Sequence, residues 1–321
     1  MNTQEDTSEA TAKQQLGQLF VVLNPMAGSC TAADVRQALE RHFSADLWNC
    51  EIYETTGAEE LSSVVRAALA EKRDLVIAVG GDGTVSDVAE ALAHTDVPLG
   101  IIPAGTANVL ARELGIPLAL ESACALLVGT HAIDRIDAMQ VGDKVFILHI
   151  GIGIDSLMIR DTERAAKRRY GRAAYLWTAA RWLLGYQPRR FTVVVDGQRY
   201  RPRAAQVLVA NGGVMGMPPF RWGPHIQLDD GKIDVCIISA RSFFDYVRVA
   251  WHMLSGRQHL NSNMRYLSAT RSIIVSADRH LPVQGDGEII SETPVQVRVV
   301  PGAVRVVVPA IQKNREPVAA Q

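Results

Sequence analysis

The sequence lacks the features that mark several large protein classes. It has four cysteines in 321 residues and no CxxC pair, so we expect free thiols in a reducing compartment rather than a disulfide framework or a zinc site. No run approaches the roughly 18 consecutive apolar residues of a membrane-spanning helix. The formal net charge is −1, which argues against a nucleic-acid-binding protein.

The composition is that of a globular protein with two domains. Hydrophobic residues make up 48% of the chain and charged residues 21%, and the length predicts about two domains. Residues 1–16 lack the basic start and apolar core of a signal peptide, so we expect a disordered tail there. We expect a second tail at 312–321. These features predict a protein of the cytoplasm that binds membranes, if at all, at their surface.

Residues 17–131 alternate between buried strands and amphipathic helices. The predicted strands are 19–23, 47–53, 75–79 and 99–102, and the predicted helices are 32–43, 58–71, 86–94 and 106–114. This alternation predicts an α/β domain with a parallel sheet and helices on both faces.

Residues 132–311 have a different pattern. Short β-rich runs occur at 191–195, 206–210, 233–239, 273–276, 295–300 and 304–308. Asp196-Gly197 follows the first run and predicts a hairpin. The pattern favours an antiparallel β-sandwich or barrel-like domain, interrupted by one long helical insertion near 156–186.

Three of the predicted parallel strands end in loops of unusual composition. The loops are Asn24-Pro25-Met26-Ala27-Gly28, Gly80-Gly81-Asp82-Gly83-Thr84 and Pro103-Ala104-Gly105-Thr106-Ala107-Asn108. Ligands of open parallel sheets bind beyond the carboxyl ends of the strands. We therefore expect the three loops to converge on one crevice.

The central loop has the composition of a phosphate-binding loop. Its glycines let the backbone approach a phosphate, and Thr84 can cap the following helix, whose N-terminus favours an anion. Asp82 would repel phosphate unless it acts on a metal ion, a hydroxyl or a bound water. A glycine-rich tight turn is the alternative, but the position between a buried strand and a helix favours the functional interpretation. The sequence contains neither GxxxxGK[ST] nor a GxGxxG after a strand.

Further motifs follow these loops in order. They are Gly151-x-Gly153-x-Asp155, Asp229-Asp230-Gly231-Lys232-Ile233-Asp234, Asp286-Gly287-Glu288 and Pro301-Gly302-Ala303-Val304-Arg305. With them, the sequence resembles the diacylglycerol kinase family of lipid kinases, in its soluble bacterial form, from Leu19 to about Pro309. The resemblance implies a phosphofructokinase-like N-terminal domain, a C-terminal β-sandwich and an active site between them. It also implies ATP, Mg²⁺ and transfer of the γ-phosphate to a lipid hydroxyl.

The resemblance carries specific roles onto residues of this chain. Glu288 corresponds to the catalytic base, with Asp82 as a second acidic group, and the choice of base between the two stays open. Asp230 corresponds to a magnesium ligand, together with the backbone carbonyls of Gln227 and Lys232. The implied nucleotide contacts are Asn24, Thr55 (with Thr56 nearly as good a match), Val79, Gly80, Gly81, Asp82, Gly83, Thr84, Val85 and Thr106.

Plainer interpretations remain for several of these motifs. Asp286-Gly287 and Asp229-Asp230-Gly231 could each be a simple turn, with Glu288 a solvated strand residue. Asp155 could be the N-cap of the following helix. Other functions stay open too: an NAD kinase, more distantly a phosphofructokinase, or a catalytically weak lipid-binding protein on the same fold.

The segment 160–190 is rich in basic and aromatic residues. It holds nine lysines and arginines against two acidic residues, with three tyrosines and two tryptophans between them. That composition is typical of an interfacial helix on an anionic membrane, although an amphipathic helix more often faces a core. We expect peripheral docking through the cluster 164–172 and phosphorylation of a membrane lipid, most simply diacylglycerol. A homodimer is left open.

Overall fold

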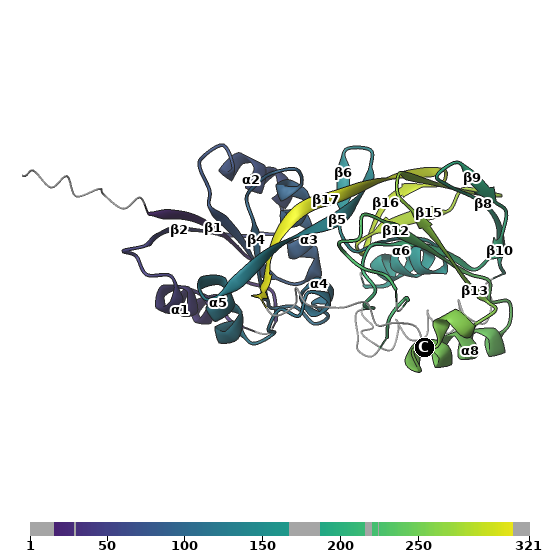
Figure 1. The fold of residues 1–321 in the computed structure, drawn as a ribbon, viewed down its shortest axis with the longest axis horizontal. Helices are drawn as coiled ribbons and strands as arrows, with labels where there is room; N and C mark the ends of the chain where they lie inside the picture. The colour runs from purple at the N-terminus through teal and green to yellow at the C-terminus, as the bar shows by residue number, and fades with distance from the viewer. Residues whose placement is uncertain (1–15, 29, 167–186, 216–219, 224, 311–321) are drawn as a thin grey trace, which may run out of the picture.

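The computed structural model describes residues 16–28, 30–166, 187–215, 220–223 and 225–310. Figure 1 shows two lobes side by side, joined by two long strands that run from one lobe into the other. The N-terminal lobe contains the three predicted loops, and the C-terminal lobe contains the later motifs.

The N-terminal lobe has a parallel sheet with strand order β4-β3-β1-β2. The strands are β1 (Gly17–Leu23), β2 (Trp48–Glu54), β3 (Leu75–Gly80) and β4 (Leu99–Pro103). The helices are α1 (Ala32–His42), α2 (Leu61–Ala68), α3 (Asp82–Leu92), α4 (Val109–Glu113) and α5 (Leu120–Val128). The predicted alternation is confirmed, and α5 is an additional helix that the sequence analysis did not identify.

The C-terminal lobe is an antiparallel sandwich, as predicted. One of its sheets has the order β13-β12-β11-β7-β15-β16, and the facing sheet contains β10-β8-β14-β17 together with β5, β6 and β9. The bounds are β5 (His131–Val141), β6 (Lys144–Phe146), β7 (His149–Gly153), β8 (Arg189–Val195), β9 (Gln198–Tyr200), β10 (Arg203–Ala204), β11 (Gln206–Ala210), β12 (Ile233–Ile238), β13 (Met264–Ala269), β14 (Ser272–Ala277), β15 (Pro282–Gly285), β16 (Glu288–Glu292) and β17 (Val295–Pro309). The hairpin predicted at Asp196-Gly197 joins β8 to β9.

The strand β17 makes the sheets of the two lobes continuous. The sequence pattern predicts two separate runs here, but the chain forms one long strand whose register shifts between Val300 and Val304. It pairs antiparallel with β5 along its length and parallel with β4 at Val306. The boundary predicted at 131/132 falls at the start of β5, which contributes to both lobes (Figure 1).

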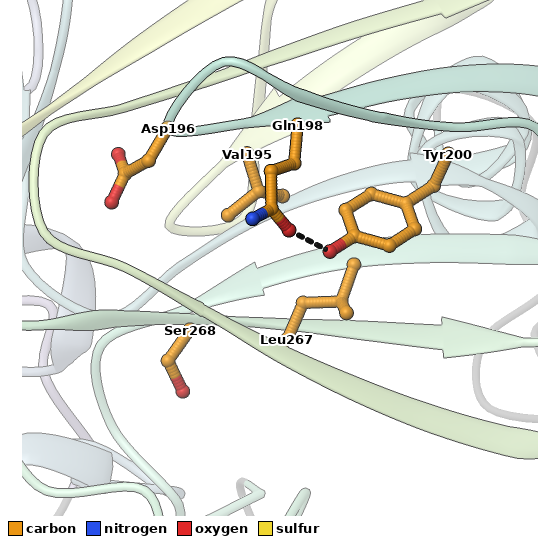
Figure 2. A pocket seen from close by; sticks show the side chains of 6 residues that line it. All are labelled: Val195, Asp196, Gln198, Tyr200, Leu267 and Ser268. Carbon is orange, nitrogen blue, oxygen red and sulfur yellow. Dashed lines mark hydrogen bonds between the residues drawn. The ribbon is translucent and has the colours of Figure 1, made fainter.

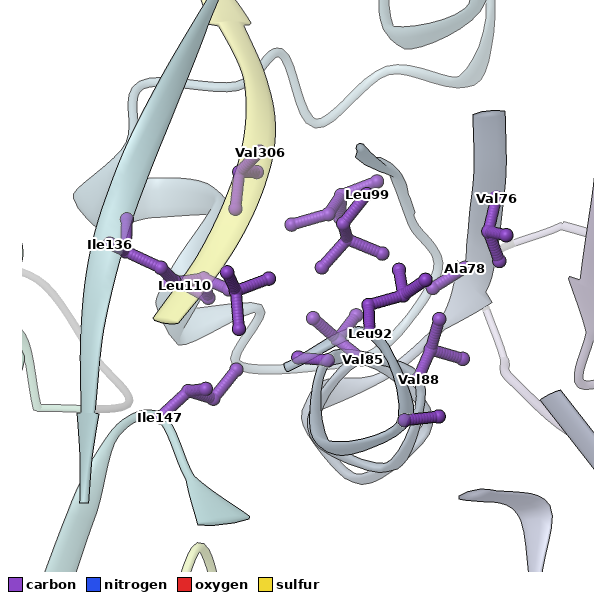
Figure 3. Close-up of a cluster of buried hydrophobic side chains, with 14 of the residues drawn as sticks. Val76, Ala78, Val85, Val88, Leu92, Leu99, Leu110, Ile136, Ile147 and Val306 are labelled. Atoms are coloured by element: carbon purple, nitrogen blue, oxygen red, sulfur yellow. The ribbon is translucent and has the colours of Figure 1, made fainter. Parts of the chain in front are cut away.

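The two hydrophobic cores follow this arrangement. One core lies between α3 and the strands around it, and Figure 3 shows Val85, Val88 and Leu92 facing side chains of β3, β4, β5 and β17. Ile147, from the link between β6 and β7, packs into the same cluster. The second core fills the space between the two sheets of the sandwich. Because Ile147 belongs to the first core, the start of β7 is fixed relative to α3.

Two further helices belong to the C-terminal lobe. The insertion predicted near 156–186 begins as α6 (Ile154–Ala166), and its continuation at 167–186 lies outside the described residues. The second helix, α8 (Phe243–Leu254), is not among the predicted elements, and a short 3-10 helix at Gln258–Leu260 follows it. None of the helices in the described ranges combines the length and apolar composition needed to span a bilayer.

Candidate active site

The glycine loop forms the junction between β3 and α3. The helix begins at Asp82 with Gly81 as its N-cap, so the prediction that Thr84 caps it is wrong. The helix begins four residues earlier than the predicted start at 86, which places Thr84 inside its first turn. There the Thr84 hydroxyl accepts a hydrogen bond from Asn24 Nδ2 at 3.2 Å. A Cβ on Gly80 would lie 2.6 Å from the Thr84 side chain, so this position requires glycine.

Asp82 fastens the glycine loop to the neighbouring loop after β4. Its Oδ1 accepts a hydrogen bond from the Val109 N–H at 2.5 Å, at the start of α4. Burial raises the pKa of Asp82, against the lowering effect of the backbone hydrogen bonds from Val109 and Asn108. The two loops also touch directly, since a Cβ on Gly105 would lie 2.5 Å from Gly81 Cα. Asp82 thus has a structural role, which the sequence motif alone did not indicate.

Asn108 gives the neighbouring loop its shape. Its side chain bonds both the N–H of Gly105, at 2.9 Å, and the carbonyl of the same residue, at 2.8 Å. Its backbone adopts a left-handed conformation (φ 47°), which asparagine tolerates better than most residues. The exposed Thr106 lies between these two anchor points. The loop therefore presents Thr106 on a fixed backbone.

The first loop is placed beside the glycine loop by backbone and side-chain contacts. The Asn24 N–H donates to the Val79 carbonyl at 3.0 Å, and Asn24 Oδ1 accepts from the Met26 N–H at 3.0 Å. The Thr55 N–H donates to the Leu23 carbonyl at 2.9 Å, so the end of β2 lies there too. These contacts bring Asn24 and Thr55 to the edge of the sheet where the glycine loop begins.

The structure distinguishes some of the predicted nucleotide contacts by their burial. Val79 and Val85 have their side chains in the hydrophobic core, so only their backbone faces the loop region. Gly83 and Thr106 are exposed. The Thr56 hydroxyl is hydrogen-bonded to the Glu59 carboxylate, an interaction that lowers the pKa of Glu59 to about 2. Thr55 is thus the more available of the two threonines.

Asp286 connects the C-terminal motif to α3. Its Oδ2 accepts from the Ser86 hydroxyl and from the Ile147 N–H, each at 3.0 Å. Its Oδ1 accepts from the N–H groups of Leu148 at 3.1 Å and His149 at 2.9 Å. One carboxylate therefore holds the β15–β16 turn against α3 and against the start of β7.

The same residues form a tight hairpin turn, as the plainer interpretation predicted. Asp286 and Gly287 both have positive φ, at 48° and 99°, and Glu288 begins β16. Gln284 Oε1 accepts from the Gly287 N–H at 2.9 Å, and Gln284 Nε2 donates to Asp155 Oδ2 at 2.8 Å. The two interpretations are therefore compatible, because the hairpin turn determines the position of Glu288 at the start of β16.

Asp155 supports this turn rather than capping a helix. It lies in the first turn of α6, after a helix start at Ile154, so the N-cap interpretation is wrong. Burial raises the pKa of its carboxyl group, against the lowering effects of His149 and Gln284. A second glutamine, Gln206, accepts the Asp155 backbone N–H at 3.0 Å. Asp155 is therefore a half-buried anchor for Gln284.

Glu288 lies exposed beside α3, in a group of carboxylates. Asp87 of α3 has its pKa raised to about 6, first by partial loss of solvent and then by the negative charges of Glu288 and Glu90. Lys144 of β6 acts in the opposite direction. Asp87 is not among the residues predicted from the sequence, because its position one residue after Ser86 carries no motif. A carboxyl group whose pKa is raised to about 6 and that lies beside Glu288 is itself a candidate functional group.

The predicted metal residues lie on a different turn, before β12. Asp230 Oδ1 accepts from the Lys232 N–H at 3.0 Å, and the Lys232 ammonium lies 4.0 Å from Oδ2. The buried Asp137 holds this turn by accepting from the Gly231 N–H at 2.7 Å, and from the Gly302 N–H of β17 at 2.7 Å. Burial raises the pKa of Asp137, and Asp230 adds to the effect. The turn is thus a structured part of the junction between the lobes.

A small pocket elsewhere in the C-terminal lobe contains none of these residues. Figure 2 shows it between β8, β9 and β13, where the Tyr200 hydroxyl donates to Gln198 Oε1 at 2.8 Å. Its lining residues are Val195, Asp196, Gln198, Tyr200, Leu267 and Ser268. The candidate site is instead the region where the three loops of the N-terminal lobe meet the β15–β16 turn.

Comparison with known proteins decides the family. Residues 18–141 match the model of the diacylglycerol kinase catalytic domain, and residues 149–308 match that of the YegS C-terminal NAD kinase beta sandwich-like domain. A protein of Pseudomonas fluorescens named "Probable lipid kinase YegS-like" is 30% identical over 279 residues, which cover 86% of this chain and 91% of that protein. The chain belongs to the diacylglycerol kinase family of lipid kinases.

Other members of the diacylglycerol kinase family agree in sequence and fold. A diacylglycerol kinase of Bacillus subtilis is 28% identical over 280 residues, covering 84% of this chain and 88% of that protein. The crystal structure of a diacylglycerol kinase from Bacillus anthracis superposes with a TM-score of 0.76 at 24% identity, over 93% of this chain and 99% of that one. The lipid kinase fold predicted from the sequence is therefore confirmed.

Proposed function

We propose that this lipid kinase transfers the γ-phosphate of ATP to the free hydroxyl of diacylglycerol and so forms phosphatidic acid. The bond between the γ-phosphorus and its bridging oxygen breaks, a new bond forms to the lipid oxygen, and ADP leaves. The hydroxyl proton passes to a carboxylate of the enzyme.

One observation supports this proposal above the others. The Ser86–Asp286 hydrogen bond ties the helix that starts at the glycine loop to the turn that carries Glu288. A phosphate at the N-terminus of α3 and a base at Glu288 would thus sit on one rigid unit. Phosphoryl transfer depends mainly on such positioning, because the protein has little covalent chemistry to perform.

Each residue has a role consistent with its contacts. Gly81 and Gly83 would let backbone N–H groups face the phosphates, while Asn24 and Thr55 would border the nucleotide at the neighbouring strand ends. Glu288 is exposed and free to face a lipid hydroxyl, whereas Asp82 is half-buried and bonded to the Val109 N–H. These contacts favour Glu288 over Asp82 as the base.

Magnesium is the metal that the family implies, and the residues at the predicted position fit it by donor type. Asp230 provides carboxylate oxygens, and backbone carbonyls such as those of Gln227 and Lys232 are also oxygen donors, as Mg²⁺ prefers. Within the described ranges, no group of three or more His, Cys, Asp or Glu side chains could enclose a metal ion. An ion held by these oxygens would retain waters, and it would supply positive charge that offsets the charge of the phosphates.

The substrate would remain in the bilayer because of its acyl chains, so we also propose that the enzyme docks peripherally on an anionic membrane. The basic cluster 164–172 predicted for this purpose lies in a segment whose side chains are outside the described residues. A Lys167/Arg168/Arg169→Ala variant tests it. It should lose affinity for anionic vesicles and keep its activity on a short-chain soluble diacylglycerol.

The function is tested by measuring ATP consumption with a panel of acceptors. Short-chain diacylglycerol, a sphingoid base, NAD and fructose 6-phosphate are compared at equal concentration. We expect phosphorylation of diacylglycerol, with phosphatidic acid detected as the product by mass spectrometry. Preference for NAD would overturn the proposed substrate. If none of the acceptors causes ATP to be consumed, the chain would belong instead to the catalytically weak lipid-binding proteins.

A further inference from the structure

The solvent-facing side of α8 is unusually apolar. Of the thirteen large hydrophobic residues that are exposed in the described ranges, six lie between Phe243 and Leu260. Five of them are on α8: Phe243, Phe244, Val247, Trp251 and Leu254 are exposed by 52%, 81%, 49%, 65% and 45%. The remaining seven are scattered over other parts of the chain. Such clustering distinguishes an interaction surface from ordinary exposed hydrophobic residues.

The exposed residues form a stripe separate from the packed face of α8. At about 100° per residue, the five side chains fall within an arc of about 100° on the helix. The packed face lies elsewhere on the helix and consists of Tyr246, Val249 and Met253, which contact the hydrophobic cluster over β11, β12 and β13. The helix thus has enough apolar surface for its own core and a second apolar stripe without a partner among the described residues.

Positive charge borders this stripe. Residues 241–260 contain three arginines and two histidines against a single acidic residue, Asp245. The Asp245 carboxylate is occupied in the capping box of α8, where it accepts from the Ser242 N–H, and it also accepts from Asn263 Nδ2. The side chains that remain to meet a partner are therefore aromatic, aliphatic and cationic.

We propose that this stripe of α8 is a membrane-docking surface that inserts into the headgroup region of an anionic bilayer. Phenylalanine and tryptophan beside arginine are the side chains that settle at that depth. A second copy of the chain fits less well, because a symmetric contact would bring the arginines of both copies together. This inference rests on the lipid kinase function, since it is the substrate that lies in the bilayer.

The docking surface is structurally continuous with the candidate site. Trp222 packs against the same hydrophobic cluster as α8, and its ring lies 6.3 Å from that of His149. The His149 N–H in turn donates to Asp286. Figure 1 places α8 on the outer side of the C-terminal lobe, beside β13. Docking through α8 would therefore place the C-terminal lobe, which carries Glu288, against the membrane.

The test compares the full-length Phe244→Ser/Trp251→Ser variant with wild type in co-sedimentation without nucleotide. The vesicles contain phosphatidylcholine with phosphatidylglycerol. We expect the dissociation constant to rise by about tenfold or more, because two large apolar side chains no longer enter the bilayer. The matched control is Leu47→Ser/Val128→Ser, which removes two exposed apolar residues from the N-terminal lobe and should bind as wild type does.

Two further measurements separate the alternatives. An Arg241→Gln/Arg257→Gln variant should show a weaker preference for anionic over neutral vesicles than wild type does. Brominated acyl chains should quench the tryptophan fluorescence of wild type more strongly than that of Trp251→Phe. Phenylalanine keeps the stripe apolar, so this comparison does not depend on weakening the docking surface. Equal quenching in both proteins would overturn the proposal. A Phe244→Ser/Trp251→Ser variant that binds vesicles as wild type does would also overturn the proposal. If light scattering shows that the same variant has changed from a dimer to a monomer, the stripe is instead a contact between two copies of the chain.

Activity assays keep this inference distinct from the proposed function. On short-chain soluble diacylglycerol the serine variant should match wild type, and on diacylglycerol in vesicles its rate should fall about tenfold. If wild type phosphorylates neither form, the proposed substrate fails, while the vesicle-binding result still decides the docking surface. Equal losses on both substrates would contradict docking as the role of α8.

Discussion

Asp286→Asn should damage both the fold and the chemistry. The substitution keeps the shape of the side chain but replaces one acceptor oxygen with an amide nitrogen. If the amide faces Ser86, that hydroxyl can rotate to accept, and the N–H of the fully buried Ile147 loses its partner. An orphaned buried N–H costs about 1–3 kcal/mol. The remaining hydrogen bonds to residue 286 would also weaken, because their acceptor would no longer carry a negative charge. Together these losses should lower the free energy of unfolding by about 2–4 kcal/mol.

The chain contains a matched control for this substitution. Asp196 also begins an Asp-Gly hairpin, with the same φ of 48°, and its carboxylate accepts three successive N–H groups and one hydroxyl. Those donors are from Thr270, Arg271 and Ser272, mostly at the exposed edge of the sandwich. Asp196→Asn should therefore destabilise the protein by only about 1 kcal/mol, because water can replace the lost acceptor.

The two variants should differ most in activity. Asp286→Asn should lower kcat by about 10- to 100-fold with little change in the KM for ATP, since it shifts Glu288 but leaves the glycine loop in place. Asp196→Asn should keep the wild-type kcat. Urea unfolding gives the stabilities, and steady-state kinetics on short-chain diacylglycerol give the rates. Activity of Asp286→Asn within about twofold of wild type, in a protein that is measurably destabilised, would refute the positioning role.

Two other substitutions give independent checks. Gly83→Ala places a Cβ in open space in the first turn of α3, so it should stabilise the fold by up to about 1 kcal/mol. The same Cβ should weaken ATP binding, because it obstructs the approach of the phosphates. Unchanged ATP affinity by calorimetry would remove Gly83 from the site. Asp87 has a folded-state pKa raised from 3.8 to about 6, so its ionisation opposes folding as pH rises through about 6. Asp87→Asn should therefore match wild type in stability below about pH 4 and exceed it at about pH 8, and a gain that is equal at both pH values would contradict the assigned shift.

The sequence was sufficient for the α/β lobe because its elements are local patterns. Buried strands such as 75–79 and the loops after them can be recognised without knowing their neighbours. The pattern does not reveal α5 because the helix follows directly on Gly115 and Pro117, residues that normally end a helix rather than precede one. The single strand β17 was divided in two because Pro301-Gly302 reads as a turn, whereas in the fold it is a register shift within one long pairing.

The candidate site could be predicted only in its motifs, not in its connections. Gly80–Thr84 and Asp286–Glu288 were both identified, but the bond between Ser86 and Asp286 joins residues 200 positions apart. Asp82 looked like a free acidic group, because nothing in the sequence shows that Val109 donates to it. The apolar stripe of α8 was missed for the same reason, since only packing shows which face of an amphipathic helix is already covered.

Glu288→Gln tests the central claim most directly. Single-turnover transfer from ATP to short-chain diacylglycerol is measured for wild type, Glu288→Gln and Glu292→Gln, a control at the other end of β16. Loss of a general base should slow transfer in Glu288→Gln by about 100-fold or more, with ATP affinity unchanged, while Glu292→Gln keeps the wild-type rate. A Glu288→Gln enzyme that transfers phosphate at nearly the wild-type rate would contradict the account and move the base to Asp82.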